Sequence, residues 1–227
     1  QFRAVDCRMS LVGTQFDVLA HCQFRKHLAA FGNQAEAELG DDVLGDDPTA
    51  QRLEAMAAER MGKEAAVYVS SGTMGNLVAT LAQTQRGDEI IAGSESHMFW
   101  NECGGASVLG GLQMRQIPND SRGMMDPQAV EAAVRAPGNI HFPRSSLLCL
   151  ENTHNRCSGG ILTPSDTRAL ADVAHSHGMQ GHMDGARIFN ASVALEVPVK
   201  ELTNEVDDLT FCLSKGLSAP AGSLVCG

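Results

Sequence analysis

Lys215 and Asp184 are the two residues whose types and positions suggest cofactor chemistry in this sequence. Each follows a short apolar run, residues 208–213 before Lys215 and residues 179–183 before Asp184. A lysine amine can form a Schiff base with the aldehyde of pyridoxal phosphate, and a buried carboxylate can keep the ring nitrogen of that cofactor protonated. A solvated lysine is the plain alternative, because aspartate and lysine at strand ends are common. The pair therefore gains meaning only from further residues.

Polar residues also follow other apolar runs. Residues 70–76, Ser-Ser-Gly-Thr-Met-Gly-Asn, lead from a predicted strand into a predicted helix. Their backbone amides and the Thr73 hydroxyl suit a phosphate, although an ordinary strand-to-helix turn has the same composition. His97 follows the strand predicted at 89–92, where its ring could stack on a flat cofactor or transfer protons near neutral pH. His154 and Cys157 have a spacing that two metal ligands could use, but no further ligands lie near them in the sequence, so we predict no metal site.

The elements that must position these residues alternate along the chain. Apolar or alternating patterns predict strands at residues 65–69, 89–92, 112–117, 147–150, 179–183 and 208–213. Capping residues predict helices that begin near Asp47, Asp126 and Thr163, and a further helix is predicted after residue 72. This alternation predicts an α/β fold with a mostly parallel sheet, whose carboxyl edge carries the polar residues.

Composition narrows the class of protein. The 227 residues include 27 acidic and 17 basic side chains, a formal net charge of −10, so we expect neither a nucleic-acid nor a membrane partner. No apolar run approaches the length of a membrane span. The 7 cysteines form no Cys-x-x-Cys pair, which indicates reduced thiols and a cytoplasmic protein. The start at Gln1 and the end at Gly227 within a strand-like run suggest a piece of a longer protein.

From about residue 39 to 227, the sequence resembles the L-threonine aldolase family, within the aromatic amino acid beta-eliminating lyase and threonine aldolase group. The matching segments, in the family's order, are Gly-Asp-Asp-Val at 40–43 with Asp-Pro-Thr at 47–49, Ser-Gly-Thr-Met at 71–74 with Asn76, Ser-His at 96–97, Glu-Asn-Thr-His-Asn at 151–155, His-Met-Asp-Gly-Ala-Arg at 182–187, and Ser-Lys-Gly-Leu at 214–217 with Ala-Pro at 219–220.

The resemblance implies a fold as well. It is the large pyridoxal phosphate domain of aspartate-aminotransferase-like enzymes (fold type I), with a mostly parallel central sheet and helices on both faces. Residues 39–227 would form this domain, incomplete at its C-terminus and lacking the small C-terminal domain. Residues 1–38 would form a divergent N-terminal segment, in which the family's opening motif is degraded to Asp-Cys-Arg-Met-Ser at 6–10.

Roles in cofactor binding follow from the same resemblance. Lys215 would hold pyridoxal 5'-phosphate covalently, and Asp184 would hold the ring nitrogen. Gly72, Thr73 and Ser214 would contact the phosphate.

Four further residues would serve the substrate side. His97 would stack on the cofactor ring and lie near the reacting bond, and Arg187 would face both the cofactor and the substrate carboxylate. His141 and His154 would lie near the substrate hydroxyl. We therefore expect Lys215, His97, His141 and His154 to be catalytic.

The implied reaction is a retro-aldol cleavage of a small amino acid. A base removes the proton of the β-hydroxyl, the Cα–Cβ bond breaks, and threonine or allo-threonine yields glycine and acetaldehyde. The family works as homodimers or homotetramers. Two alternatives remain open: β-elimination or amino transfer with the same cofactor, and a truncated chain without activity.

Overall fold

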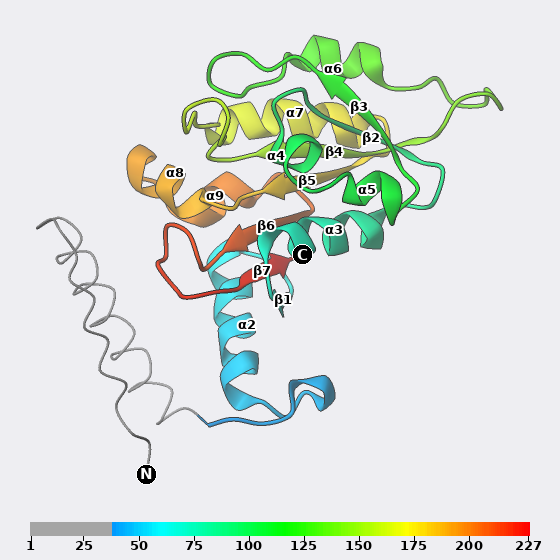
Figure 1. Cartoon of the computed structure of the whole chain (residues 1–227). Coiled ribbons are helices and arrows are strands. Elements are labelled where there is room, and N and C mark those ends of the chain that lie inside the picture. Colours follow the sequence, from blue (N-terminus) through cyan, green and yellow to red (C-terminus); the bar gives the residue numbers. More distant parts are fainter. Residues whose placement is uncertain (1–37) are drawn as a thin grey trace, which may run out of the picture. The chain divides into compact units, whose positions relative to one another are not determined.

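The computed structural model describes residues 38–227 (Figure 1). The chain divides into two units, residues 1–49 and residues 50–227. The N-terminal segment predicted at 1–38 lies, apart from Glu38, outside the described residues. The domain boundary predicted after residue 38 therefore stays a prediction.

The described part of the first unit is a short acidic loop. Its 3-10 turn η1 (Asp42–Leu44) is capped by Asp41, whose Oδ1 accepts a hydrogen bond of 3.1 Å from Val43 N. Asp47 Oδ1 accepts a hydrogen bond of 2.9 Å from Thr49 N, as expected for the residue before helix α2 (Pro48–Met61). Gly62, with φ of +67°, follows the last residue of α2, so both predicted ends of this helix are confirmed.

The second unit contains a sheet of seven strands. They are β1 (Ala66–Val69), β2 (Glu89–Gly93), β3 (Gln113–Ile117), β4 (Ser145–Glu151), β5 (Gln180–Asp184), β6 (Asp208–Cys212) and β7 (Ser223–Cys226). Their order in the sheet is β1-β7-β6-β5-β4-β2-β3. Neighbours from β6 to β3 pair in parallel, and β7 runs antiparallel to β1 and β6. The predicted, mostly parallel sheet is confirmed.

Helices cover both faces of the sheet (Figure 1). On one face lie α3 (Gly72–Gln83), which packs against β5, β6 and β7, and the short α4 (His97–Trp100) and α5 (Gly105–Val108). The other face packs against α6 (Pro127–Ala133) and α7 (Pro164–Ser176), and α7 in turn contacts α9 (Val199–Thr203). Helix α8 (Ile188–Leu195) packs against α9. Among residues 38–227, no helix combines the length and the apolar character that crossing a bilayer needs.

Side chains on the central strands alternate between the two faces. Ile91, Leu148 and Met183 belong to the main hydrophobic core together with residues of α7, whereas Ile90 and Leu147 pack with Met98 in a smaller core on the α3 side. All residues of β2, β4 and β6 are buried, as expected for strands covered on both faces. The period of two thus decides which strand residues face α3.

Helix α7 shows how local sequence sets the ends of an element. Thr163 Oγ1 accepts a hydrogen bond from Asp166 N, and the Asp166 carboxylate accepts one from Thr163 N, which completes the predicted capping box. Gly178, with φ of +69°, follows the last turn as predicted.

Helix α3 approaches the sheet closely because of a glycine. A Cβ on Gly75 would lie 2.6 Å from Thr210 Cγ2 and 3.1 Å from Thr210 Oγ1 of β6. No real pair of carbon atoms tolerates such a distance, so a larger residue would push α3 away from the strands it covers.

We therefore expect Gly75→Ala to lower the free energy of unfolding by about 1–3 kcal/mol, despite the better helix propensity of alanine. Removing the clashing side chain as well, in Gly75→Ala with Thr210→Ala, should cost less than the sum of the two single changes. Urea unfolding of the four chains measures this coupling. Strictly additive effects would contradict the close packing.

Candidate functional site

One cavity at the carboxyl edge of the sheet, of about 370 Å³, brings together most of the residues selected from the sequence. The predicted residues that line it are Gly72, Thr73, His97, Asp184, Ser214 and Lys215. They come from four different parts of the chain, and they meet because parallel strands end at the same edge of the sheet. The cavity has the size of a small-molecule site.

Asp184 is the last residue of β5 and is 3% exposed. Its Oδ1 accepts a hydrogen bond of 3.1 Å from Ala186 N, and its Oδ2 accepts one of 3.0 Å from Asn76 Nδ2. These two donors from different elements fix the plane of the carboxylate and compensate for its burial. Asp184 is thus a fixed acceptor on the cavity wall.

The N-terminus of α3 forms another wall of the cavity. Ser71 caps the helix, since its Oγ accepts a hydrogen bond of 3.2 Å from Met74 N. A Cβ on Gly72 would lie 2.7 Å from Cys212 Sγ and 3.8 Å from Lys215 Nζ. Only glycine lets the first turn of α3 come this close to Cys212 of β6, and this places the turn beside the lysine. The amides of this turn and the helix dipole favour an anion beside an amine.

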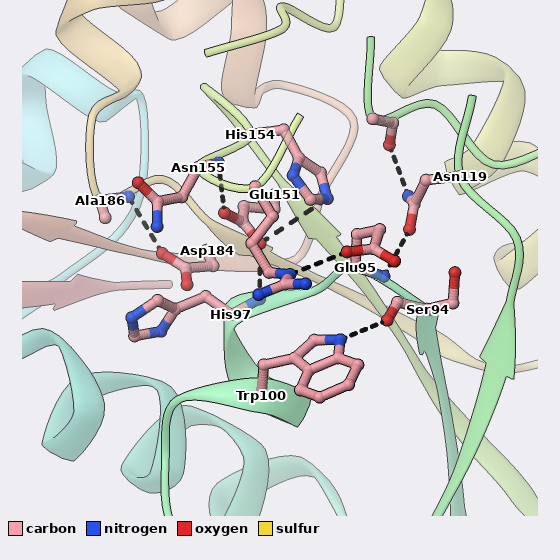
Figure 2. A network of polar contacts seen from close by, with 12 residues as sticks. Ser94, Glu95, His97, Trp100, Asn119, Glu151, His154, Asn155, Asp184 and Ala186 are labelled. Carbon is pink, nitrogen blue, oxygen red and sulfur yellow. Dashed lines mark hydrogen bonds and ion pairs between the residues drawn. The ribbon is translucent and has the colours of Figure 1, made fainter. Parts of the chain in front are cut away.

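His97 is the first residue of α4 and is held from two sides, of which Figure 2 shows the contact with Glu151. Its backbone N donates to Glu151 Oε2 at 2.8 Å, and its Nδ1 lies 2.9 Å from Glu102 Oε1. The hydrogen bond to Glu102 is the main reason why the pKa of His97 is raised, against the opposing effect of burial. With Nδ1 engaged by Glu102, the other ring nitrogen remains for the cavity.

Glu151 and His154 lie together behind this wall (Figure 2). Glu151 ends β4 beside Asp184, and burial, together with the charge of Asp184, raises its pKa to about 7. His154 is 1% exposed, and its Nε2 lies 3.8 Å from Glu151 Oε2. Burial lowers the pKa of His154. Within residues 38–227, no hydrogen-bond partner reaches His154 Nδ1.

Arg187 lines a neighbouring cavity of about 360 Å³ rather than the one around Lys215. Asn155 and Asn190 line the same space, so this second cavity offers cationic and amide donors close to the carboxyl edge. The structure therefore places Arg187 near the predicted site but not within its main cavity.

His141 lies apart from the main cavity. It is exposed in the loop before β4, and its backbone N donates to Asn139 Oδ1 at 3.0 Å. Residues that precede β4 lie at the amino edge of the sheet, opposite Asp184 and Lys215. Its predicted role came from the family resemblance and not from its position beside a strand. Within this chain, the structure does not bring His141 to the main cavity, and its predicted role near the substrate hydroxyl stays a prediction.

Three site residues had no predicted role. Asn76 and Glu102 line the main cavity, and Glu151 supports His97 from behind. Asn76 could have been found from helical spacing, because it lies four residues after Gly72 on the same side of α3. Nothing in the local pattern around Glu102 distinguishes it from a surface acid.

The donor atoms of His97, Glu102 and Asp184 lie within 4.8 Å of one another, which is close enough for a cation. The hydrogen bonds of Asn76 to both carboxylates and of His97 to Glu102 already account for this cluster. We therefore assign no metal to it.

The raised pKa of Glu151 predicts a dependence of stability on pH. Its pKa rises from 4.5 to about 7 on folding, so ionisation in the folded state is unfavourable, and stability falls as the pH rises through this range. We expect Glu151→Gln, which cannot ionise, to gain up to about 3 kcal/mol relative to the parent between pH 5 and pH 8.

Urea unfolding at the two pH values measures this difference, with Glu201→Gln as a control at an exposed position in α9. Parallel stability curves for Glu151→Gln and the parent would contradict the assignment.

Comparisons with a family model, with relatives of known name and with a solved structure agree with the fold of this chain. A family model described as beta-eliminating lyase matches residues 28–227. The chain is 44% identical over 227 residues to low-specificity L-threonine aldolase 1 of Arabidopsis thaliana, covering 99% of this chain and 60% of the relative.

It is also 44% identical over 191 residues to low specificity L-threonine aldolase of Escherichia coli (strain K12), covering 84% of this chain and 56% of the relative. It therefore spans little more than half the length of these relatives. A solved threonine aldolase of Leishmania major superposes with a TM-score of 0.66 at 20% identity, covering 75% of this chain and 51% of that one, which shows a shared fold. The resemblance read from the sequence is thus confirmed, and the chain belongs to the beta-eliminating lyase family.

Proposed function

We propose that this chain is the cofactor-binding part of a pyridoxal phosphate-dependent L-threonine aldolase, which cleaves L-threonine or L-allo-threonine to glycine and acetaldehyde. The observation that carries the proposal is a single cavity that presents the Lys215 amine, the buried Asp184 carboxylate and the N-terminus of α3. The names of the relatives support the choice of reaction.

The residues around the cavity fit pyridoxal phosphate. The cofactor needs an amine for its aldehyde, a carboxylate for its ring nitrogen and an anion site for its phosphate. Lys215 and Asp184 supply the first two. The first turn of α3, with Gly72 and Thr73, supplies the third together with Ser214. When bound, the cofactor supplies a ring that accepts the electron pair released as a bond to Cα breaks.

The polar residues of the chain have separate tasks in this proposal. The Asp184 carboxylate lies opposite the ring nitrogen, oriented by Ala186 N and the Asn76 amide. His97 stacks on the cofactor and presents Nε2 toward the reacting bond, because Glu102 engages Nδ1. Arg187 binds the substrate carboxylate from the neighbouring cavity.

Proton transfer is the step that needs a base near the β-hydroxyl. His97 is the candidate base that lines the cavity. Because its pKa is raised, the neutral ring accepts a proton more readily, and the protonated ring is a weak acid that can return the proton near neutral pH. His154 lies in the wall behind Glu151 and acts in this proposal through that carboxylate.

A second reaction remains a candidate because the family model is described as beta-eliminating lyase. Lys215, Asp184 and the α3 N-terminus would serve β-elimination or amino transfer equally well, since they bind the cofactor and not the departing group. The products separate the two reactions: glycine with acetaldehyde, or ammonia with a keto acid.

Cellular context follows from the proposed reaction. The chain would serve threonine catabolism and glycine biosynthesis in the cytoplasm, acting on a small amino acid. We propose a homodimer or homotetramer, supported by the apolar side chains of Met74, Val78 and Leu81, which are exposed along the outer face of α3.

The first test is covalent capture of the cofactor. Pyridoxal phosphate is added to the purified chain, borohydride makes a carbon–nitrogen link to a lysine permanent, and peptide mass spectrometry locates it. We expect the label on Lys215, none in Lys215→Ala, and none on Lys63 or Lys200. A folded chain without a label on Lys215 would overturn the proposed cofactor site.

Incubation of the loaded chain with L-threonine then tests the reaction. We expect acetaldehyde and glycine in equal amounts, and a loss of at least 100-fold in Lys215→Ala. Labelling of Lys215 without these products would indicate that the chain binds the cofactor but does not catalyse the cleavage.

A further inference from the structure

Asp184 is connected to a fully buried histidine through one amide. His182 lies two residues earlier on β5, on the same face of the strand, and is 0% exposed. Its Nε2 lies 3.2 Å from Asn76 Oδ1, and Asn76 Nδ2 donates to Asp184 Oδ2 at 3.0 Å. On its other side, His182 Nδ1 lies 2.6 Å from Asp208 Oδ1. A hydrogen-bonded chain thus runs from Asp208 to the cavity.

The donors and acceptors of this chain decide the charge of the histidine. Asn76 Nδ2 also donates to Glu102 Oε1 at 2.8 Å, so the amide nitrogen faces two carboxylates and the amide oxygen must face His182. An amide oxygen and an ionised carboxylate can only accept hydrogen bonds. Both ring nitrogens of His182 therefore have to donate, which requires the doubly protonated imidazolium.

We propose that His182 is a permanently charged positioning residue, whose imidazolium orients the Asn76 amide and thereby holds Asp184 as a fixed anion facing the cofactor ring nitrogen. The proposal rests on the proposed function only for the role of Asp184. The charge of His182 follows from contacts within the chain.

Charges around the ring agree with this assignment. Burial lowers the pKa of His182, but the charge and hydrogen bond of Asp208 outweigh it, helped by the charges of Asp184 and Glu102, so the pKa is raised overall. Two further titratable groups lie nearby. The Cys149 thiol, whose pKa burial raises, stays protonated, and the Lys63 ammonium feels the charge of Asp208.

Asp208 has a second support that keeps it in place. Gln83 Nε2, at the end of α3, donates to Asp208 Oδ2 at 2.7 Å. Helix α3 therefore holds both ends of the chain, Asp208 through Gln83 and Asp184 through Asn76. A buried ion pair satisfied in this way resists the loss of its proton, because a neutral ring would leave the Asp208 charge unpaired.

The molecule contains a matched control. His175 Nε2 lies 2.9 Å from Asp207 Oδ2. This pair is of the same type, and its aspartate is the residue before Asp208. Both side chains of this second pair are partly exposed, and the further hydrogen bond to Asp207 Oδ2, donated by Gly181 N, lies at the beginning of β5 and away from the cavity. A change at His175 therefore shows the effect of losing a histidine–aspartate pair alone. A change at His182 also breaks the connection to Asp184.

The charge is read by NMR of the full chain with 15N-labelled histidine rings, and the signals of His182 are assigned by their loss in His182→Phe. We expect both ring nitrogens of His182 to carry protons at pH 7.5, where an ordinary histidine is mostly neutral. A neutral His182 at pH 7.5 would overturn the proposal.

The effect of His182 on cofactor binding is measured as the dissociation constant of pyridoxal phosphate, obtained from the absorbance of the bound cofactor. We expect His182→Phe and Asn76→Ala each to weaken binding at least 10-fold, and the double variant to be no weaker than the worse single one, since both break one chain. His175→Phe should bind within 2-fold of the parent. Unchanged binding in a folded His182→Phe chain would overturn the proposal.

Asp208→Asn keeps the shape of the site if His182→Phe does not fold. We expect this variant to lose the second proton of His182 near neutral pH and to bind the cofactor more weakly, and an unchanged charge and affinity would contradict the proposal. A parent chain that binds no pyridoxal phosphate would contradict the proposed function, whereas the NMR result decides the charge of His182 independently.

Discussion

The burial of Asp184 next to two other carboxylates is the constraint on which the rest of the site depends. Glu151 ends the neighbouring strand and Glu102 shares the Asn76 amide with Asp184, so three acids meet at one edge of the sheet. Isolated buried carboxylates would take up protons rather than stay charged. The fold compensates for their burial with hydrogen-bond donors at fixed places, which are backbone amides, the Asn76 amide and the ring of His97.

These acids do not respond to burial in the same way. Glu151 has two backbone donors, but burial and the charge of Asp184 raise its pKa to about 7. Asp184 is tied through Asn76 to His182 and Asp208, which brings a positive ring within reach of its charge. The different surroundings suit different tasks, because Glu151 can exchange a proton near neutral pH, whereas Asp184 is held in one orientation by fixed donors.

Helix α3 and strand β6 make this arrangement possible. Two glycines, Gly72 and Gly75, allow the helix to lie against Cys212 and Thr210 at distances that any other residue would prevent. The close approach brings Asn76 down to Asp184 and His182, and it places the first turn of α3 beside Lys215. Packing between helix and sheet is thus also what assembles the polar site.

The sequence by itself determined the elements and much of the site. Periodicity and capping residues gave the strands and the ends of α2 and α7, because these depend on neighbours within a few residues. Lys215, Asp184, His97 and the segment around Thr73 were found because residues after parallel strands share one edge.

Only the tertiary structure decided which distant groups meet. It made β7 antiparallel to β6, and it placed His141 at the opposite edge of the sheet and Arg187 in the neighbouring cavity. It also joined Asn76 through His182 to Asp208, across more than 100 residues of chain. These outcomes depend on strand order and on the packing distance of α3, and no local pattern of residues encodes either of them.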